Sequence, residues 1–257
     1  MTTQKEKVEV FVKLHVKGSP LILFNIWDAG SAIAVAESGV KAIATSSWSV
    51  AAANGYADGE KLSLDLAINN LKRIVKSVDL PVTIDFEGGY ATGKSELCEN
   101  IKRVINVGPV GINFEDQIVG GTGLYSVEEQ TKRIETVRQT AEKEGIFLFI
   151  NARTDVFLKN YSDYGESHLD EAIERAKAYA NAGASGFFAP GLRDTESIKQ
   201  LAEASPIPLN IMVLPNVPSN DQLAELGVSR ISYGAAPYNR LIEFLKESAR
   251  KAFDEAG

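Results

Sequence analysis

Eight short apolar runs recur along the sequence, and most of them are rich in β-branched residues. Runs of this kind are typical of strands that are buried on both faces of a parallel sheet. The predicted strands cover residues 21–26, 42–46, 82–87, 111–115, 147–153, 186–189, 209–213 and 230–233. Amphipathic segments with a helical period lie between them, among them residues 62–78, 127–143, 168–182 and 194–204. Ser63, Ser126 and Asp194 occupy the positions expected of helix N-caps.

This alternation of eight strands with helices, without a break in composition, predicts a single (β/α)₈ TIM barrel over residues 1–257. The alternative is an open doubly wound sheet, which usually has five or six strands and often carries a GxGxxG fingerprint that is absent here. We expect a helix over about residues 5–16 to cap the barrel, and a last helix over about residues 238–255. Pro237 disfavours helix at Ala236, so the chain is expected to leave the barrel in extended form.

The composition argues against several partners. A formal net charge of −7 disfavours nucleic acid and anionic membranes, which need basic clusters. No run of about 18 apolar residues is present, so no transmembrane helix is expected. The single cysteine, Cys98, cannot form an intrachain disulfide, and the first residues lack the apolar core of a signal peptide. We therefore expect a cytoplasmic protein.

Carboxylates follow two of the predicted strands at the end where a TIM barrel carries its active site. Asp85 and Glu87 end the third strand and, being two residues apart, should face the same side of it. Glu115 ends the fourth strand. Three carboxylates at one mouth repel each other unless a cation binds, and oxygen ligands favour Mg²⁺, with Mn²⁺ also suitable, over Zn²⁺. The alternative is that such carboxylates cap the following helices, as Asp28 and Asp155 could do.

Other polar and aromatic residues at the strand ends are candidates for binding substrate. Arg153 can bind a carboxylate or phosphonate through two N–H groups, or it can form an internal salt bridge to Glu87 or Glu115. The serines after the second strand could form an anion-binding nest, although serines are also common in such turns. The candidate substrate-binding residues are Trp27, Ser46, Ser47, Trp48, Arg153 and Asn210.

The two histidines and the cysteine lie away from the strand ends. We expect His15 and His168 to be surface or helix-capping residues. We expect Cys98 to pack between helices.

Five ordered motifs resemble those of the isocitrate lyase/phosphoenolpyruvate mutase superfamily. They occupy residues 25–32, 46–48 together with 54–58, 85–90, 113–117 and 151–155. The resemblance extends from about Phe11 to the end of the chain. It implies Mg²⁺ bound at Asp85, Glu87 and Glu115, and a small 2-oxo or 2-hydroxy acid as substrate. It also implies that Asp58, near the metal, is catalytic together with Arg153.

The same resemblance implies an assembly. In that superfamily the last helix of the barrel is exchanged with a neighbouring subunit, usually in a dimer of dimers. We therefore expect a homo-oligomer, with a homotetramer favoured.

One segment departs from the superfamily. The lyases carry K-[KR]-C-G-H after the fourth strand and the mutases a lysine and an asparagine, whereas residues 118–125 here contain none of these. Gly120, Gly121, Thr122 and Gly123 instead suggest a short mobile lid, although an ordinary loop would look the same. Residues 189–191 also lack the glutamate found in the methylisocitrate lyases.

These features predict a Mg²⁺-dependent lyase that cleaves a C–C bond next to a 2-oxo acid through a metal-stabilised enolate, by decarboxylation or retro-Claisen cleavage. One alternative is a phosphoenolpyruvate phosphonomutase or phosphonopyruvate hydrolase that acts on a P–C bond. Another is a barrel that binds a 2-oxo acid without turning it over.

Overall fold

Eight parallel strands form one sheet in a computed structural model that describes residues 2–160 and 164–254. The strands follow the order β1-β8-β7-β6-β5-β4-β3-β2, so β1 and β2 are the first and last strands of the sheet. Their bounds are β1 Leu21–Leu23, β2 Ile43–Ala44, β3 Val82–Asp85, β4 Gly111–Glu115, β5 Phe149–Arg153, β6 Gly186–Phe188, β7 Leu209–Met212 and β8 Arg230–Ser232.

The sheet closes into a barrel through the chain that follows β1. Ile26 forms an isolated parallel bridge with Thr45. The Ile26 N–H donates to the Ala44 carbonyl at 2.9 Å, and the Ser46 N–H donates to the Ile26 carbonyl at 3.1 Å. An open sheet would leave these edges apart, so the predicted TIM barrel is confirmed.

Asn25 strengthens this closure because its side chain links three strands. Its Nδ2 donates to the Thr45 carbonyl at 2.8 Å, next to β2. Its Oδ1 accepts hydrogen bonds from the N–H groups of Tyr233 and Gly234, both at 2.9 Å, just after β8. The amide therefore ties the ends of β1, β2 and β8 together at the mouth of the barrel.

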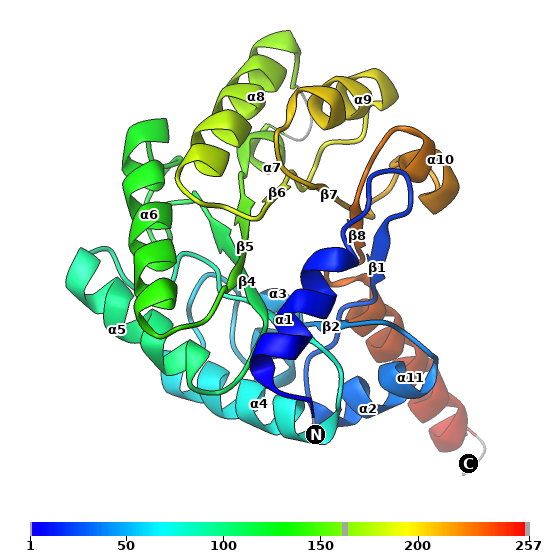
Figure 1. Cartoon of the computed structure of the whole chain (residues 1–257). Coiled ribbons are helices and arrows are strands. Elements are labelled where there is room, and N and C mark those ends of the chain that lie inside the picture. Colours follow the sequence, from blue (N-terminus) through cyan, green and yellow to red (C-terminus); the bar gives the residue numbers. More distant parts are fainter. Residues whose placement is uncertain (1, 161–163, 255–257) are drawn as a thin grey trace.

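Helices surround the sheet in a ring (Figure 1). Their bounds are α2 Ala29–Glu37, α3 Ser47–Ala53, α4 Leu64–Ser77, α5 Lys94–Ile105, α6 Val127–Lys143, α7 Val156–Lys159, α8 Glu166–Asn181, α9 Thr195–Ala204 and α10 Asn220–Glu225. The four helices predicted from periodicity correspond to α4, α6, α8 and α9, with ends that agree within two residues. Ser63, Ser126 and Asp194 cap three of these helices through their side chains, as expected.

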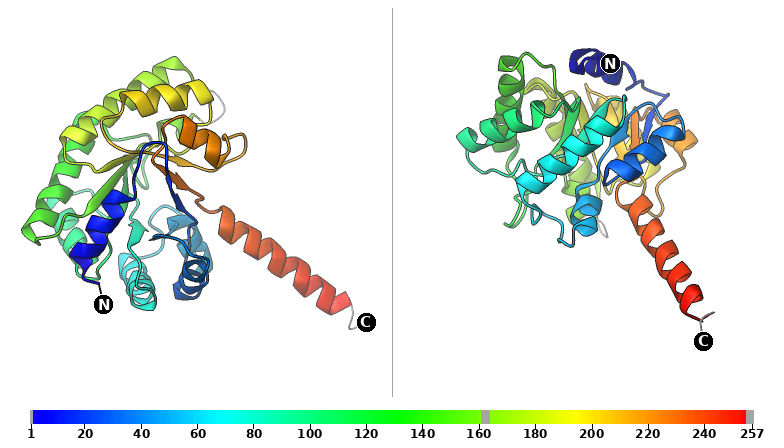
Figure 2. Two further views of the ribbon diagram at one scale, coloured as in Figure 1. Left: turned by 45° about the vertical axis from the view of Figure 1, so that its right-hand side comes forward. Right: turned by 90° about the horizontal axis from the view of Figure 1, so that it is seen from below.

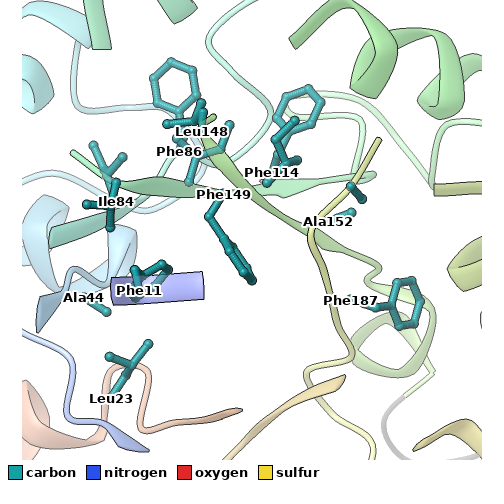
Figure 3. Packing of buried hydrophobic residues seen from close by; sticks show 14 of the residues in the cluster. Phe11, Leu23, Ala44, Ile84, Phe86, Phe114, Leu148, Phe149, Ala152 and Phe187 are labelled. Carbon is teal, nitrogen blue, oxygen red and sulfur yellow. The ribbon is translucent and has the colours of Figure 1, made fainter. Parts of the chain in front are cut away.

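The helix α1 (Gln4–Lys13) closes the amino-terminal end of the barrel (Figures 1 and 2). Phe11 packs edge-on against Phe149 of β5, with ring centroids 5.2 Å apart, and Figure 3 shows both rings within the buried core. His15, just after α1, stacks on the Phe149 ring with centroids 4.2 Å apart and meets the Phe11 ring edge-on at 4.8 Å. The Nδ1–H of His15 also donates to the Phe11 carbonyl in the last turn of α1 at 2.8 Å, so the expected capping role is confirmed, while the half-buried ring packs in the floor of the barrel.

His168 and Cys98 behave as expected. His168 Nδ1 accepts the Gly165 N–H at 3.1 Å, at the start of α8. The Cys98 thiol lies in α5 and accepts a hydrogen bond from the Thr140 hydroxyl of α6 at 3.4 Å, so it packs between two helices.

The last helix, α11 (Ala236–Asp254), extends away from the barrel at the end opposite α1 (Figure 2). It begins at Ala236, so the expectation of an extended chain before Pro237 is wrong. A proline in the first turn removes only an N–H that has no partner within the helix. Residue 255, where the helix was expected to end, lies outside the described residues. None of the helices in the described chain is long and apolar enough to cross a membrane.

The buried position of His15 predicts a dependence of stability on acid pH. Burial, then the nearby Arg230 charge, lowers the pKa of His15 to about 3, below its usual value near 6.5. The unfolded chain therefore takes up a proton between pH 6.5 and 3 that the folded chain does not. The unfolding free energy should fall as the pH drops through this window, by up to about 1.4 kcal/mol per pH unit.

Urea unfolding at pH 7 and pH 5 would measure this effect. His15→Phe keeps an aromatic ring on Phe149 but does not titrate, so its stability should fall less between the two values. An equal fall in the variant and the wild type would show that His15 does not cause the dependence.

Candidate active site

A cavity of about 650 Å³ opens at the carboxyl ends of the strands. Its wall includes six residues predicted from the sequence, which are Ser46, Ser47, Trp48, Asp58, Asp85 and Arg153. Another part of the wall is apolar and is formed by Leu158, Phe188, Met212, Val213 and Leu214. The cavity thus combines a charged region with an apolar region large enough for a small organic acid.

Asp85 is the last residue of β3, and only one of its carboxylate oxygens is hydrogen-bonded. Oδ2 accepts the N–H of Ser47 at 3.3 Å and the Ser47 hydroxyl at 3.0 Å. Oδ1 is buried and has no hydrogen-bond partner among the described residues. A buried carboxylate oxygen without a donor is unfavourable unless something else binds it.

Glu87 does not share a strand face with Asp85, and the prediction that it does is wrong. The strand ends at Asp85, and the backbone at Glu87 has a φ of +47°. Glu87 therefore lies in a turn, where the alternation of side chains along a strand no longer applies. Its Oε2 accepts the Glu60 N–H at 2.8 Å, and its Oε1 accepts the Tyr90 hydroxyl at 3.4 Å. Burial, then the charges of Asp58 and Asp85, raises the pKa of Glu87 to about 8.

Arg153 ends β5 and holds two buried carboxylates. Nη1 contacts Glu115 at 2.9 Å, and Nε and Nη2 contact Asp155 at 2.6 and 2.9 Å. The internal salt bridge expected as an alternative is therefore present to Glu115. These contacts use three of the five N–H donors of a guanidinium, so two remain available to a ligand.

Asp155 has a role that the sequence did not reveal. It was expected only to cap the following helix, but its side chain makes no capping hydrogen bond to α7 and instead binds Arg153. Asp28 does cap α2, where it accepts the Ser31 N–H at 2.7 Å. Burial raises the pKa of Glu115 well above its usual value, and Arg153 only partly opposes this effect.

Asp116 is a further buried carboxylate, which lies in the motif at residues 113–117 but for which the sequence predicts no role. Its Oδ1 accepts the Asp155 N–H at 3.0 Å. Its Oδ2 accepts hydrogen bonds from Arg175 Nη1 at 3.1 Å and from the Tyr179 hydroxyl at 2.9 Å. Asp116 therefore holds in place the backbone that positions Asp155 beneath Arg153. The only signal in the sequence is an arginine and a tyrosine four residues apart on α8.

Asp58 reaches the cavity from the loop after α3. The residue is partly exposed, but burial of its carboxyl group, followed by the charge of Asp85, raises its pKa. Asp58 therefore lies close enough to Asp85 to be affected by its charge.

Trp27 and Asn210 lie outside the wall of this cavity. Trp27 packs edge-on against Tyr238 of α11 at 5.1 Å. Asn210 is fully buried and its Oδ1 accepts the Ser232 hydroxyl at 3.1 Å. Contacts of these two residues with a substrate remain predictions.

The glycine-rich segment forms a small hairpin. Gln117 and Leu124 form an antiparallel bridge, and the Ile118 N–H donates to the Gly123 carbonyl at 3.2 Å. Gly120 and Gly123 have φ values of +75° and +83°, which only glycine adopts easily. Residues 118–125 do not line the cavity, so a lid formed by Gly120, Gly121, Thr122 and Gly123 remains a prediction.

The residues at the mouth fit a hard divalent cation, although not as the three direct ligands that were expected. Across residues 2–160 and 164–254, no three Asp, Glu, His or Cys side chains converge closely enough to hold a metal ion. The unpaired Asp85 Oδ1 is the oxygen best suited to bind one directly. Mg²⁺ usually binds one or two carboxylates and keeps several waters. Glu87, which is already hydrogen-bonded, and Glu115, which is paired with Arg153, would then lie outside the set of direct ligands.

The fold and the site define a TIM-barrel enzyme with a carboxylate-rich mouth beside an arginine. Residues 11–253 match the family model described as phosphoenolpyruvate phosphomutase, and the chain belongs to this family. The predicted membership of the isocitrate lyase/phosphoenolpyruvate mutase superfamily is thus confirmed, and with it an enzyme of the lyase or mutase class.

Three similar proteins illustrate the family. A Burkholderia cenocepacia protein, provisionally assigned as a phosphonomutase, has a crystal structure that matches with a TM-score of 0.94 and 45% identity, covering 97% of this chain and 99% of that one. The 2-methylisocitrate lyase of Escherichia coli is 27% identical over 88% of this chain and 77% of its own. The oxaloacetate decarboxylase of Pseudomonas entomophila is 28% identical over 89% of this chain and 78% of its own.

The contacts of Arg153 predict that Arg153→Lys is not a conservative change. Lysine cannot hold Glu115 and Asp155 at once through a planar fork and also present two N–H groups to a ligand. The free energy of unfolding should fall by roughly 2 kcal/mol. Affinity for oxalate, a mimic of enolpyruvate, should fall roughly 10- to 100-fold in the presence of Mg²⁺.

Urea unfolding and titration calorimetry of the same preparation would measure the two effects. Arg193→Lys, on the loop before α9 and outside this cavity, serves as a control. Lost stability with unchanged oxalate affinity would limit Arg153 to a structural role.

Proposed function

We propose that this enzyme cleaves a C–C bond next to a 2-oxo acid, with a divalent cation bound at Asp85. The observation that carries the proposal is the pairing, in one cavity, of an unpartnered Asp85 oxygen with an arginine that keeps two free N–H donors. The first group suits a cation and the second suits a carboxylate. A 2-oxo acid presents both kinds of partner, a carbonyl oxygen and a carboxylate.

The chain's own residues would bind and orient this substrate. The free N–H groups of Arg153 would hold its carboxylate, and Asp58 and Asp85 would provide oxygen ligands for Mg²⁺. When bound, the cation supplies Lewis-acid polarisation of the 2-oxo group. Ser47 fixes the orientation of Asp85 through two hydrogen bonds, so the carboxylate does not need to reorganise during the reaction.

The hairpin at residues 118–125 favours a reaction that needs no acid from this loop. It contains no cysteine, histidine or lysine that could protonate a leaving group. Decarboxylation releases carbon dioxide, which requires no proton, and the enolate that it leaves can take its proton from water. The similarity to the Pseudomonas entomophila oxaloacetate decarboxylase supports this choice within the superfamily.

A second candidate is rearrangement or hydrolysis of a P–C bond. The match to the phosphoenolpyruvate phosphomutase model supports it, as does the Burkholderia cenocepacia structure at 45% identity. The same arginine fork could bind a phosphonate.

A turnover assay separates the two candidates. Oxaloacetate, 2-methylisocitrate and phosphonopyruvate would be supplied with Mg²⁺ or with EDTA, while pyruvate and phosphate are measured. We expect pyruvate from a C–C substrate with Mg²⁺ only. Asp85→Asn should lose nearly all of this activity because it replaces a cation ligand by a neutral amide, while its stability changes little.

Three results would count against the proposal. Phosphate release from phosphonopyruvate alone would favour the second candidate. Equal turnover with EDTA would show that the reaction needs no divalent cation. Full activity of Asp85→Asn would show that the Asp85 carboxylate is not needed for the reaction.

We further propose that α11 is exchanged between subunits of a homotetramer or homodimer. Phe244 and Leu245 are 67% and 59% exposed, although they lie on the apolar side of a long helix. Ile22 and Phe24, on and after β1, are also exposed, at the seam beside β8 that an eighth helix would cover. A helix from a second subunit would fit that seam, and each large apolar side chain buried there would contribute about 1.5–3 kcal/mol.

Light scattering at micromolar concentration should give a mass at least twice the 27.8 kDa of one chain. Phe244→Asp with Leu245→Asp should dissociate the assembly, because charges would replace the buried apolar contact. Glu247→Lys, which changes charge on the same helix, should leave it intact. A mass of one chain for the wild type would refute the exchange.

A further inference from the structure

We propose that Asn113 donates a hydrogen bond to an anionic oxygen of the substrate, and that the buried Arg230 is a positioning residue that fixes the Asn113 amide for this contact. The inference rests on the proposed function only for the class of ligand, a small acid with a carboxylate or enolate oxygen. The residues involved lie on β4 and β8, beneath the carboxylates and Arg153 described above.

Arg230 is a buried cation without an anionic partner. Its side chain is fully buried and reaches from β8 to β4, across the interior of the barrel. Nη2 donates to Asn113 Oδ1 at 3.1 Å, whereas Nε and Nη1 have no acceptor among residues 2–160 and 164–254. Within the described chain no carboxylate forms an ion pair with it. Burial lowers the pKa of Arg230 to about 9, and Asp85 partly opposes this, so the group stays charged at neutral pH.

Such a residue is hard to explain by stability alone. Burying a charge without a counter-charge is costly, and apolar residues of similar volume often replace buried ionic groups without loss of stability. Among the described residues, the one hydrogen bond of the Arg230 side chain goes to Asn113. A role for Arg230 therefore involves the Asn113 amide.

The contact resolves which way the Asn113 amide points. Oδ1 accepts hydrogen bonds from Arg230 Nη2 and from Asn151 Nδ2, the latter at 2.9 Å. A guanidinium only donates, so the amide cannot turn over without placing its own NH₂ against a cation. Oδ1 is thereby held toward the interior of the barrel, and Nδ2 is left with no acceptor among the described residues.

The free Nδ2 belongs to a residue that lines the cavity. Asn113 contributes to the same wall as Asp85 and Arg153, and its backbone is paired with Asp85 on β3 and with Asn151 on β5. It therefore places a neutral N–H donor between the residue that suits a cation and the strand that carries the arginine. A fixed donor of this kind stabilises negative charge on a substrate oxygen without reorganisation.

Replacing the donor by an acceptor gives the sharpest test. Asn113→Asp would give Arg230 the carboxylate that it lacks, so the ligand-free protein should become more stable. The same change places negative charge at the cavity, so calorimetry with oxalate and saturating Mg²⁺ should show affinity lower by roughly 100-fold or more. Asn113→Ala removes the donor without adding charge and should weaken oxalate binding roughly 10-fold.

Arg230→Met tests the positioning role. Its stability to urea should match or exceed that of the wild type, while oxalate affinity falls roughly 10-fold because the amide is free to turn. Thr83→Val is the matched control. Thr83 is buried, its hydroxyl has no partner in the part of the chain that the structure describes, and the change keeps its shape, so binding should be unchanged.

Opposite results overturn the inference. Oxalate affinity within threefold of the wild type in Asn113→Asp or Asn113→Ala would remove Asn113 from the binding site. Reduced stability with unchanged affinity in Arg230→Met would make Arg230 structural. If oxalate binds as predicted but no 2-oxo acid is cleaved, the proposed reaction fails and this inference stands. A wild type that binds no oxalate overturns both.

Discussion

The mouth of this barrel is governed by repulsion among its carboxylates. Burial raises the pKa values of Asp58 and Glu87, and the charge of Asp85 raises both further. Arg153 pairs with two further carboxylates, Glu115 and Asp155, so its single charge offsets only part of this repulsion. The ligand-free site consequently disfavours full ionisation of its carboxyl groups. A divalent cation is the partner that such a charge distribution favours most, and the unpaired oxygen of Asp85 is where it can be received.

The support for this arrangement extends well behind the cavity. Asp116 accepts hydrogen bonds from Arg175 and Tyr179 of α8 and also from the Asp155 N–H. The helix α8 thereby fixes the position of the Asp155 backbone. Arg133 of α6 plays a comparable part for the β3 loop, where its guanidinium donates to the backbone carbonyl of Ala91 at 3.1 Å and lies over the Tyr125 ring at 4.5 Å. Helices on the outside of the barrel thus fix the geometry of the charged loops at its mouth. A substitution on α6 or α8 can therefore alter the site without touching a ligand.

The sequence predicts the elements of this fold better than it predicts the roles of single residues. Apolar runs and helical periodicity locate the strands and α6, because both signals depend on local burial. They place the end of β3 at residue 87 rather than at Asp85, and so they give the Glu87 side chain the wrong direction. They also miss the stacking of His15 on Phe149, which lies far along the chain, and the role of Asp155, which could equally have capped a helix. Orientation at a strand end and long-range pairing depend on tertiary packing, and the amino-acid pattern does not record them.

The joint between β1 and β2 has a mechanical consequence. Seven junctions of the barrel are regular ladders, but this one consists of the Ile26–Thr45 bridge and the Asn25 side chain. Local opening is easiest where the fewest backbone hydrogen bonds must break together. The segments rooted at this joint carry Ser46, Ser47 and Trp48 on one side and Trp27 on the other. The barrel can therefore open locally between β1 and β2. This opening would widen the entrance to the cavity while the strands that carry Asp85 and Arg153 stay rigid.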